Sequence, residues 1–320
     1  MSNDNVITMR QAETEELIEA VIREMERHKL SQAKVSQQIG KSGSALNQFL
    51  KGSYPSAKGA AEIAELLGQW LDSRAEKRRS LSEIPKVPGY TETPSSKRIH
   101  AALAYAQMFG DSAVIYGVPG VGKTFTAQAY QRGAPSVWIA TMSPSAASIA
   151  AALEEICEAL GLRDAGYSAA KMKRAILRRL RDTEGLLVID EAQHLSTRAL
   201  EEIRSLNDAS GVGLAFMGSE VVYVRMTGGN RANEMAQLFS RQGKRVHIQK
   251  TSAQDIAALL AAWKIDDTAI QRAAEEIGTR PGGLRGLTKT LRLASMFAAG
   301  EGKPMTRDHV AHAWRDLGGE

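Results

Sequence analysis

Gly117-Val-Pro-Gly-Val-Gly-Lys-Thr124 is the stretch that decides the fold. It fits in full the pattern G-x-x-x-x-G-K-[ST]. A short apolar run, Ala113–Tyr116, comes directly before it, and a predicted helix, Thr124–Tyr130, follows. This strand–loop–helix context separates a phosphate-binding loop from a chance glycine-rich turn. The sequence therefore predicts an α/β domain that binds a nucleotide.

Each part of the loop has an expected role. Glycines let the backbone N–H groups wrap around phosphates, and the helix that follows directs its positive end at them. Lys123 is expected to reach the β- and γ-phosphates of ATP, and Thr124 to bind Mg²⁺. The predicted ATP-binding residues are Gly117, Val118, Pro119, Gly120, Val121, Gly122, Lys123, Thr124 and Phe125.

A second motif, Leu186-Leu-Val-Ile-Asp190-Glu191, predicts a buried strand that ends in two carboxylates. Asp190 is expected to complete the magnesium site, as in other phosphate-loop enzymes. Glu191 is then placed to polarise the attacking water. The alternative is an acidic pair that only caps the strand or forms salt bridges. His194 follows, and we expect it to be structural.

Strand and helix patterns alternate around these motifs, which predicts a parallel sheet covered on both faces. The predicted strands are Ala113–Tyr116, Val137–Ala140, Leu186–Ile189, Leu214–Met217 and Val246–Ile248. After Thr251 only helical patterns remain. They predict a small C-terminal helical lid made of Ala253–Trp263, Thr268–Ile277, Gly283–Ala299 and Arg307–Leu317.

The N-terminal region has short helical patterns with a glycine turn between the second and the third, which is the helix-turn-helix plan. The predicted helices are residues 13–28, a helix capped by Ser31 and ended by Gly40, Ser42–Leu50, and Ala60–Leu71. The expected inward side chains are Leu17, Ile18, Val21, Ile22, Met25, Val35, Ile39, Leu46, Phe49 and Leu50.

Pro85, Pro88 and Pro94 interrupt a polar stretch without an apolar period, which is typical of a linker. The predicted division of the chain is therefore a helix-turn-helix domain (1–73), a linker (74–98), an ATPase core (99–250) and a helical lid (251–320).

Composition narrows the class of protein further. The chain has 320 residues, 24% charged residues and a net charge of +5, which permits a polyanionic partner. Cys157 is the single cysteine, so an intramolecular disulfide is excluded and a reducing compartment is favoured. The N-terminus has no signal-peptide pattern, and no run approaches the ~20 apolar residues of a membrane helix. We therefore expect a cytoplasmic protein without a membrane segment.

The phosphate loop, the Asp-Glu pair and the C-terminal helical lid resemble those of AAA+ ATPases. Further stretches resemble the B transposition proteins of Mu-like transposing phages, and so does an N-terminal helix-turn-helix before the ATPase. The resemblance covers nearly the whole chain and weakens in the linker. The matching stretches are Gly117–Tyr130, Leu186–Leu195, Met226–Arg231, Leu238–Arg241 and Pro281–Arg285.

The resemblance implies roles for further residues. Ser219 matches the first sensor position, and Arg285 matches the second, which reports the γ-phosphate to the lid. Arg241 and Arg245 match candidates for an arginine finger given to a neighbouring subunit. Such a finger stabilises charge on the phosphoryl oxygens in the transition state. The alternative for each arginine is a solvated charge or a local carboxylate partner.

Three groups of residues are candidates for binding double-stranded DNA. Ser31–Gly52 resembles the helix-turn-helix of lambdoid phage repressors, although a protein-docking module is the alternative. A basic stripe on a predicted helix opposes Met172, Ile176 and Leu180, although an ordinary solvated face is the alternative. The candidate DNA contacts are Lys41, Ser42, Ser44, Asn47 and Gln48 in the first region, Lys171, Arg174, Arg178 and Arg181 in the second, and Arg225 and Arg231 beside a glycine-rich loop.

The resemblance implies an ATP-dependent DNA-binding ATPase with little sequence preference. Such a protein assembles as a helical homo-oligomer on target DNA in the bacterial host cytoplasm, delivers the DNA to the phage transposase, and leaves on hydrolysis. The alternative is an ATP-switched, sequence-specific regulator. A related AAA+ protein of bacterial secretion or helicase loading is a third possibility, and the N-terminal helix-turn-helix and the lack of a membrane segment disfavour the secretion version. A two-lobed helicase is disfavoured, because only about 70 residues follow Ile248.

Overall fold

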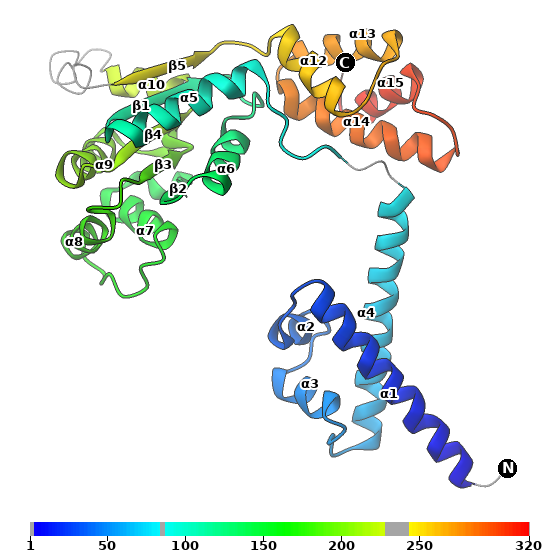
Figure 1. Ribbon diagram of the computed structural model, residues 1–320. Coiled ribbons are helices and arrows are strands. Elements are labelled where there is room, and N and C mark those ends of the chain that lie inside the picture. The colour runs from blue at the N-terminus through cyan, green and yellow to red at the C-terminus, as the bar shows by residue number, and fades with distance from the viewer. Residues whose placement is uncertain (1–2, 84–86, 228–242, 320) are drawn as a thin grey trace. The chain divides into compact units, whose positions relative to one another are not determined.

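The computed structural model describes residues 3–83, 87–227 and 243–319. The chain divides into two compact units, Met1–Pro85 and Lys86–Glu320, each described by itself below. Figure 1 shows the helical N-terminal unit in blue to cyan and the larger unit from turquoise through green and yellow to red. The larger unit contains both the predicted ATPase core and the predicted lid.

The N-terminal unit is all-α, with α1 (Asn3–Arg27), α2 (Gln32–Gln38), α3 (Gly43–Leu50) and α4 (Ala57–Glu83). Ser31 and Ser42 cap α2 and α3 by accepting hydrogen bonds from the N–H groups three residues on, the usual N-cap arrangement. Gly40 follows α2 at φ +67. The helix-turn-helix plan is therefore present.

The structure differs from the sequence expectation at the two ends of the predicted linker and at Ile22. Helix α4 continues to Glu83 and α5 begins at Pro94, so both ends of the predicted linker, 74–98, are helical. A buried carboxylate explains the first difference. Glu24 on α1 accepts hydrogen bonds from Arg74 (2.9 Å) and Arg78 (3.1 Å), which hold the polar end of α4. Ile22, expected inside, is 41% exposed.

The unit's core is formed by apolar side chains from all four helices. Its fully or nearly buried members are Val21, Val35, Ile39, Leu46, Phe49, Ile63, Leu67 and Trp70. Burial disfavours a charge on Glu24, but the hydrogen bond from Arg74 and the charges of Arg78 and His28 outweigh it and lower the pKa of Glu24. This carboxylate thus stays ionised where it joins the two long helices.

The larger unit is built on a parallel sheet in the order β2-β3-β4-β1-β5. All the predicted strands are confirmed: β1 (Ser112–Gly117), β2 (Val137–Thr141), β3 (Leu186–Asp190), β4 (Gly213–Gly218) and β5 (Lys244–Ile248). Parallel strands place their carboxyl ends at one edge of the sheet, which is where ligands bind in open α/β sheets. Because β4 lies between β1 and β3, the residues that follow these strands gather at one place.

Helices cover both faces of the sheet, as the alternation predicted (Figure 1). α5 (Pro94–Phe109) and α6 (Lys123–Gly133) pack on the face that contains Ile115 and Val188. The other face contains Val114 and Ile189, and buried side chains of the helices on that side, among them Val222 and Met226, pack against it. The elements on this side are η1 (Pro144–Ala147), α7 (Ile149–Ala159), α8 (Ala169–Leu180), η2 (Ala192–His194), α9 (Thr197–Ser210) and α10 (Glu220–Thr227).

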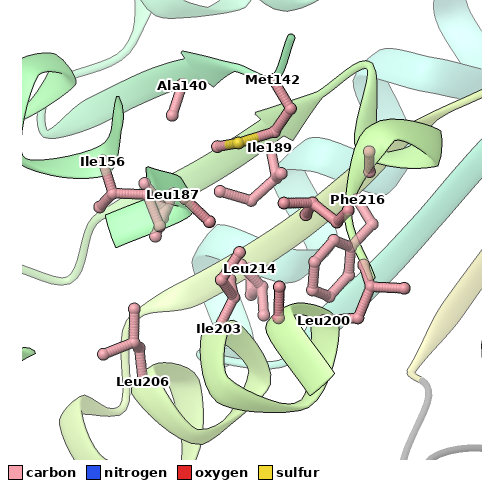
Figure 2. Packing of buried hydrophobic residues seen from close by; sticks show 14 of the residues in the cluster. Ala140, Met142, Ile156, Leu187, Ile189, Leu200, Ile203, Leu206, Leu214 and Phe216 are labelled. Carbon is pink, nitrogen blue, oxygen red and sulfur yellow. The ribbon is translucent and has the colours of Figure 1, made fainter. Parts of the chain in front are cut away.

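Figure 2 shows how this second face is filled. Leu200, Ile203 and Leu206 project from α9 toward Leu214 and Phe216 of β4. The spacing of the helix residues is that of one helical face, whereas Leu214 and Phe216 are two apart on a strand. Cys157 on α7 belongs to the same cluster and is 5% exposed. Burial raises the pKa of its thiol.

The lid contains α12 (Ala253–Ala262), α13 (Thr268–Thr279), α14 (Gly283–Gly300) and α15 (Arg307–Asp316), which confirms the predicted helices. Asp255, 1% exposed, joins α12 to the start of α5. Its carboxylate accepts hydrogen bonds from the Ser95 N–H (2.8 Å) and hydroxyl (2.7 Å), and from Ser252. Across the described parts of the chain, no helix is both long enough and apolar enough to span a membrane.

Candidate nucleotide site and basic surface

The phosphate loop has a backbone that only glycine adopts easily. Gly117, Gly120 and Gly122 have φ values of +142, +86 and +92, in the region that side chains disfavour. Space is also restricted, since a Cβ on Gly117 would lie 2.0 Å from the carbonyl oxygen of Ile248. On Gly120 it would lie 1.9 Å from the carbonyl oxygen of Gly282. The glycines therefore let the loop pass between β5 and the lid.

Lys123 begins α6 and turns its ammonium back over the loop. Its Nζ donates to the carbonyl oxygens of Gly117 and Val118, both at 3.0 Å. Burial lowers the pKa of Lys123, although the carboxylates of Glu191 and Asp190 offset part of the effect. An ammonium held over the loop in this way can exchange carbonyl oxygens for phosphate oxygens by rotating its side chain.

Thr124 and Asp190, the two predicted magnesium ligands, are brought together. The Thr124 hydroxyl donates to Asp190 Oδ2 at 2.6 Å. Burial raises the pKa of Asp190, against the hydrogen bonds from Thr124 and the Glu191 N–H. A hydroxyl and a carboxylate beside a phosphate loop are the hard oxygen ligands that Mg²⁺ prefers. The residues present therefore fit a magnesium ion bound together with a nucleotide.

Glu191 and Ser219 also meet at this edge of the sheet. Glu191 follows β3 with a left-handed backbone, φ +53, and Ser219 follows β4. The side chain of Gln193 lies between them. Its amide donates to Glu191 Oε2 and accepts from the Ser219 N–H at 3.1 Å. The predicted base and the predicted first sensor are thus joined through one amide.

A cavity of about 600 Å³ connects the loop to the lid, within the usual ~300–1,000 Å³ of a small-molecule site. Glu191, Ser219 and Arg285 line it together with the loop. Arg285 also donates its backbone N–H to the carbonyl oxygen of Gly120 at 3.1 Å. The structure thus gathers these three predicted residues around one cavity.

Several lining residues escaped the sequence analysis. Tyr90 lies in the predicted linker, yet its ring is 5.8 Å from that of Phe125. Trp263 ends α12 and lines the lid side. Neither carries a sequence signal, because each reaches the cavity only through folding. The other unpredicted lining residues include Gln193, Leu259, Leu284, Thr288, Lys289 and Arg292.

Of the four other predicted arginines outside α8, two lie within the described residues, and neither lines this cavity. Arg245 is exposed on the edge strand β5, is not among the residues that line the cavity, and donates to the Tyr223 hydroxyl at 2.7 Å. Arg225, on α10, donates to the carbonyl oxygens of Gln193 (2.6 Å) and Leu195 (2.5 Å). Arg231 and Arg241 lie outside the described residues.

The predicted basic stripe forms one side of α8. Met172, Ile176 and Leu180 are buried, which confirms the predicted orientation of the helix. On the opposite side, a second cavity of about 590 Å³ is lined by four cationic side chains and by Asp164. The cationic side chains are those of Lys171, Arg174, Arg178 and Arg181, and all four residues are exposed.

In the helix-turn-helix, some of the predicted DNA-contacting side chains already make contacts within the protein. Lys41 Nζ lies 2.6 Å from Glu62 on α4. The hydrogen bond from Lys41 and its positive charge lower the pKa of Glu62. Ser42 caps α3 through the Ala45 N–H. Ser44 and Gln48 are exposed. Asn47 is half-buried.

Comparison with known proteins tests the resemblance. The family described as "Mu B transposition protein, C terminal" matches residues 240–317, and the family described as "AAA domain" matches residues 110–226. The ATP-dependent target DNA activator B of Escherichia phage Mu is 38% identical over 283 residues, which cover 88% of this chain and 89% of that protein. This chain belongs to the family of Mu B transposition proteins.

A second member of the family is nearly as similar. The Mu-like prophage FluMu DNA transposition protein B of Haemophilus influenzae is 37% identical over 264 residues, or 82% of this chain and 90% of that protein. The fold extends beyond the family. The Aeropyrum pernix ORC2 protein, solved as ADPNP and ADP complexes, has a TM-score of 0.51 at 17% identity, over 69% of this chain and 65% of that one. The predicted family and the AAA fold are therefore confirmed.

Proposed function

We propose that this chain is an ATP-hydrolysing protein that binds target DNA with little sequence preference and assembles on it as a homo-oligomer. It then presents that DNA to a phage transposase, stimulates strand transfer and is released when ATP is hydrolysed. The single observation that carries the proposal is the 38% identity to the ATP-dependent target DNA activator B of phage Mu along 88% of the chain. The site described above supplies the chemistry.

The nucleotide half of the proposal rests on the cavity between loop and lid. Lys123 neutralises phosphate charge, and the loop N–H groups bind phosphate oxygens. Glu191 accepts a hydrogen bond from the attacking water and turns its lone pair toward the γ-phosphate. Arg285, whose backbone N–H is bonded to the loop, carries the state of the phosphates to the lid. Magnesium, held by Thr124 and Asp190, would supply further charge neutralisation.

The DNA half rests on the cations of α8. Four positive side chains surround one hollow. Such a group can neutralise several phosphates at once, because the DNA backbone carries negative charges at regular intervals. The buried apolar side of α8 fixes the helix on the ATPase core, so the four exposed charges all lie on its outer side. Such a surface reads charge and shape but no base edges. This supports binding of double-stranded DNA with little sequence preference.

Assembly would complete the nucleotide site in a second subunit. Arg245 is exposed on the sheet edge and away from the cavity of its own chain. A guanidinium in that place can reach a neighbouring subunit's nucleotide, where it would stabilise transition-state charge. Arg241 stays a second candidate for this finger.

Sedimentation and electron microscopy of the full chain with duplex DNA test the proposal. We expect ATP-dependent oligomers on DNA of unrelated sequences, and their loss as ATP is consumed. A protein that stays monomeric under every nucleotide condition contradicts the assembly. Strand-transfer assays with the cognate transposase test target delivery, and an unchanged yield on adding the protein with ATP contradicts it.

The N-terminal unit supports a second candidate function, an ATP-switched regulator that binds an operator. Ser44 and Gln48 on α3 are exposed polar side chains in the position of a recognition helix. Footprinting separates the candidates. A single protected palindrome supports the regulator, whereas uniform ATP-dependent protection supports the transposition protein.

A further inference from the structure

Gln193 makes a contact that neither the motifs nor the comparisons assign. It lies in η2, directly after the Asp-Glu pair, and its side chain lines the nucleotide cavity. The amide nitrogen donates to Glu191 Oε2, and the amide oxygen accepts from the Ser219 N–H. One side chain thereby links the ends of β3 and β4.

Chemistry fixes the orientation of this amide. The Ser219 N–H is a donor, so it requires the amide oxygen, and the NH₂ group must then face the Glu191 carboxylate. A flipped amide would place two acceptors together at Glu191 and two donors together at Ser219. Gly218 supplies the space, since a Cβ there would lie 2.2 Å from Gln193 Oε1.

The backbone of Glu191 is fixed as well. It has φ +53 and ψ +35, a conformation that costs a residue with a side chain ~1–3 kcal/mol. Its N–H donates to Asp190 Oδ1 at 3.0 Å. The side chain, however, has free rotation beyond Cα unless a partner holds the carboxylate. Gln193 is the partner that the structure gives it.

The turn that carries Gln193 is itself tied to α10. Arg225 donates from one guanidinium nitrogen to the carbonyl oxygens of Gln193 and Leu195. Ser219, whose N–H orients the amide, immediately precedes α10. A shift of α10 would therefore move both supports of the Gln193 amide together.

We propose that Gln193 is a positioning residue for ATP hydrolysis, which aims the Glu191 carboxylate and makes that aim depend on the place of α10. The role rests on the proposed function, in which Glu191 polarises the attacking water. Without the amide, Glu191 samples several rotamers and the fraction of sites ready for reaction falls. Misplacement by ~1 Å costs an enzyme up to ~100-fold in rate.

The test compares Gln193→Ala and Gln193→Glu in the full-length protein. Glutamate has the same shape but loses the donor and places a second carboxylate against Glu191. We expect kcat for ATP to fall ~10- to 100-fold in both, more in Gln193→Glu, with KM and the dissociation constant for a fluorescent ATP analogue within ~2-fold. His194→Ala, in the same turn, is the matched control and should keep kcat.

Combination with Glu191→Gln shows whether Gln193 acts through Glu191. If it does, adding Gln193→Ala to Glu191→Gln causes no further loss, because the two changes are coupled. Three results would overturn the role. They are a fall in kcat of the double variant that equals the product of the two single falls, an unchanged kcat in the Gln193 variants, or an effect on KM alone. If Gln193→Ala does not fold, as judged by its thermal transition, Gln193→Glu decides in the same way.

The outcomes also separate this role from the proposed function. A wild-type protein that does not hydrolyse ATP refutes the proposed function and the role with it. A slow Glu191→Gln variant beside normal Gln193 variants refutes only the role. Arg225→Ala is an independent test. It removes the hydrogen bonds to the turn that carries Gln193, so we expect a lower kcat and an unchanged DNA affinity. Loss of DNA affinity with normal kcat would instead make Arg225 a DNA contact.

Discussion

The Thr124 hydroxyl and the Asp190 carboxylate are 2.6 Å apart, although 66 positions separate them in the chain. The contact brings together the first residues of α6 and the end of β3 across the intervening strand β4. It places both oxygen ligands beside the loop that is to hold the phosphates. The proposed magnesium site is therefore assembled by the order of the strands and not by any local run of sequence.

Replacing Lys123 with alanine should abolish most nucleotide binding. A hydrogen bond to a charged group contributes ~1.5–3 kcal/mol, so the dissociation constant for ATP should rise ~10- to 150-fold. Stable DNA association should be lost with it. Titration with a fluorescent ATP analogue measures the first effect. Lys303→Ala, an exposed lysine on the lid, is the control, and equal affinities in the two variants would contradict the assigned role.

Replacing Glu191 with glutamine should separate binding from hydrolysis. Glutamine keeps the size of the side chain but is a poor base, so kcat should fall ~100- to 10,000-fold. ATP affinity should change little, and DNA complexes should persist longer after ATP is added. Phosphate release and a filter-binding time course measure the two effects. Hydrolysis at the normal rate would show that Glu191 is not the residue that polarises water.

Neutralising α8 should weaken DNA binding and flatten its salt dependence. Each lost phosphate contact lowers the slope of log K against log salt by ~0.9. Lys171, Arg174, Arg178 and Arg181 should be changed to glutamine singly and together, with affinity measured at several salt concentrations. The charge-matched control changes four lid residues, Arg272, Lys303, Arg307 and Arg315. Equal slopes in the two quadruple variants would remove α8 from the DNA surface.

Stability should depend on Asp255 above about pH 4. Burial disfavours its charge, but the hydrogen bonds from Ser95 and Ser252 outweigh burial and lower its pKa below the usual 3.8. A lowered folded-state pKa stabilises the fold at neutral pH, and that stability disappears as pH falls through it. Asp255→Ala should cost ~2–3 kcal/mol at pH 7. Urea unfolding from pH 7 to 3 should show this difference shrinking at the acid end.

Asp266→Ala is the control for this change, because Asp266 is exposed in the same lid. Its unfolding curve should follow that of the wild type at each pH. An Asp255 difference that stays constant down to pH 3 would mean that packing, and not the charge, explains the loss.

Gly120→Ala should disturb the loop and the lid together. The backbone there has φ +86, and a Cβ would lie 1.9 Å from the Gly282 carbonyl oxygen. The strain alone is worth ~1–3 kcal/mol, which should appear as a lower melting temperature and weaker ATP binding. Gly68→Ala, in the middle of α4 with open space around it, should raise the melting temperature instead. Equal melting temperatures would contradict the close contact.

Patterns that repeat along the chain predicted most of the fold. The strands, the lid helices and the orientation of α8 depend on local apolar periodicity, which one sequence displays in full. The extension of α4 to Glu83 could not be found in this way. Its polar residues Arg74 and Arg78 gain their stability from Glu24, which is 50 and 54 positions away.

The residues of the site also fall into those that a local pattern predicts and those that depend on distant contacts. Lys123, Thr124, Asp190 and Glu191 were predicted because phosphate chemistry demands them at fixed spacings. Tyr90 and Trp263 line the cavity, and many residue types can line a cavity, so neither position belongs to a motif. Gln193 was visible in the motif, but its meaning depends on the Ser219 N–H at the end of another strand.

The single cysteine has a practical consequence. Cys157 is buried, and burial and the nearby Glu154 raise the pKa of its thiol, whereas only the thiolate attacks a thiol-reactive reagent. Cys157 should therefore react slowly with maleimide dyes, so it does not have to be replaced before other sites are labelled. One engineered cysteine on α9 and another on α15 would take a donor and an acceptor dye. The efficiency of energy transfer between the dyes would then report the movement of the lid relative to the ATPase core as ATP binds and is hydrolysed.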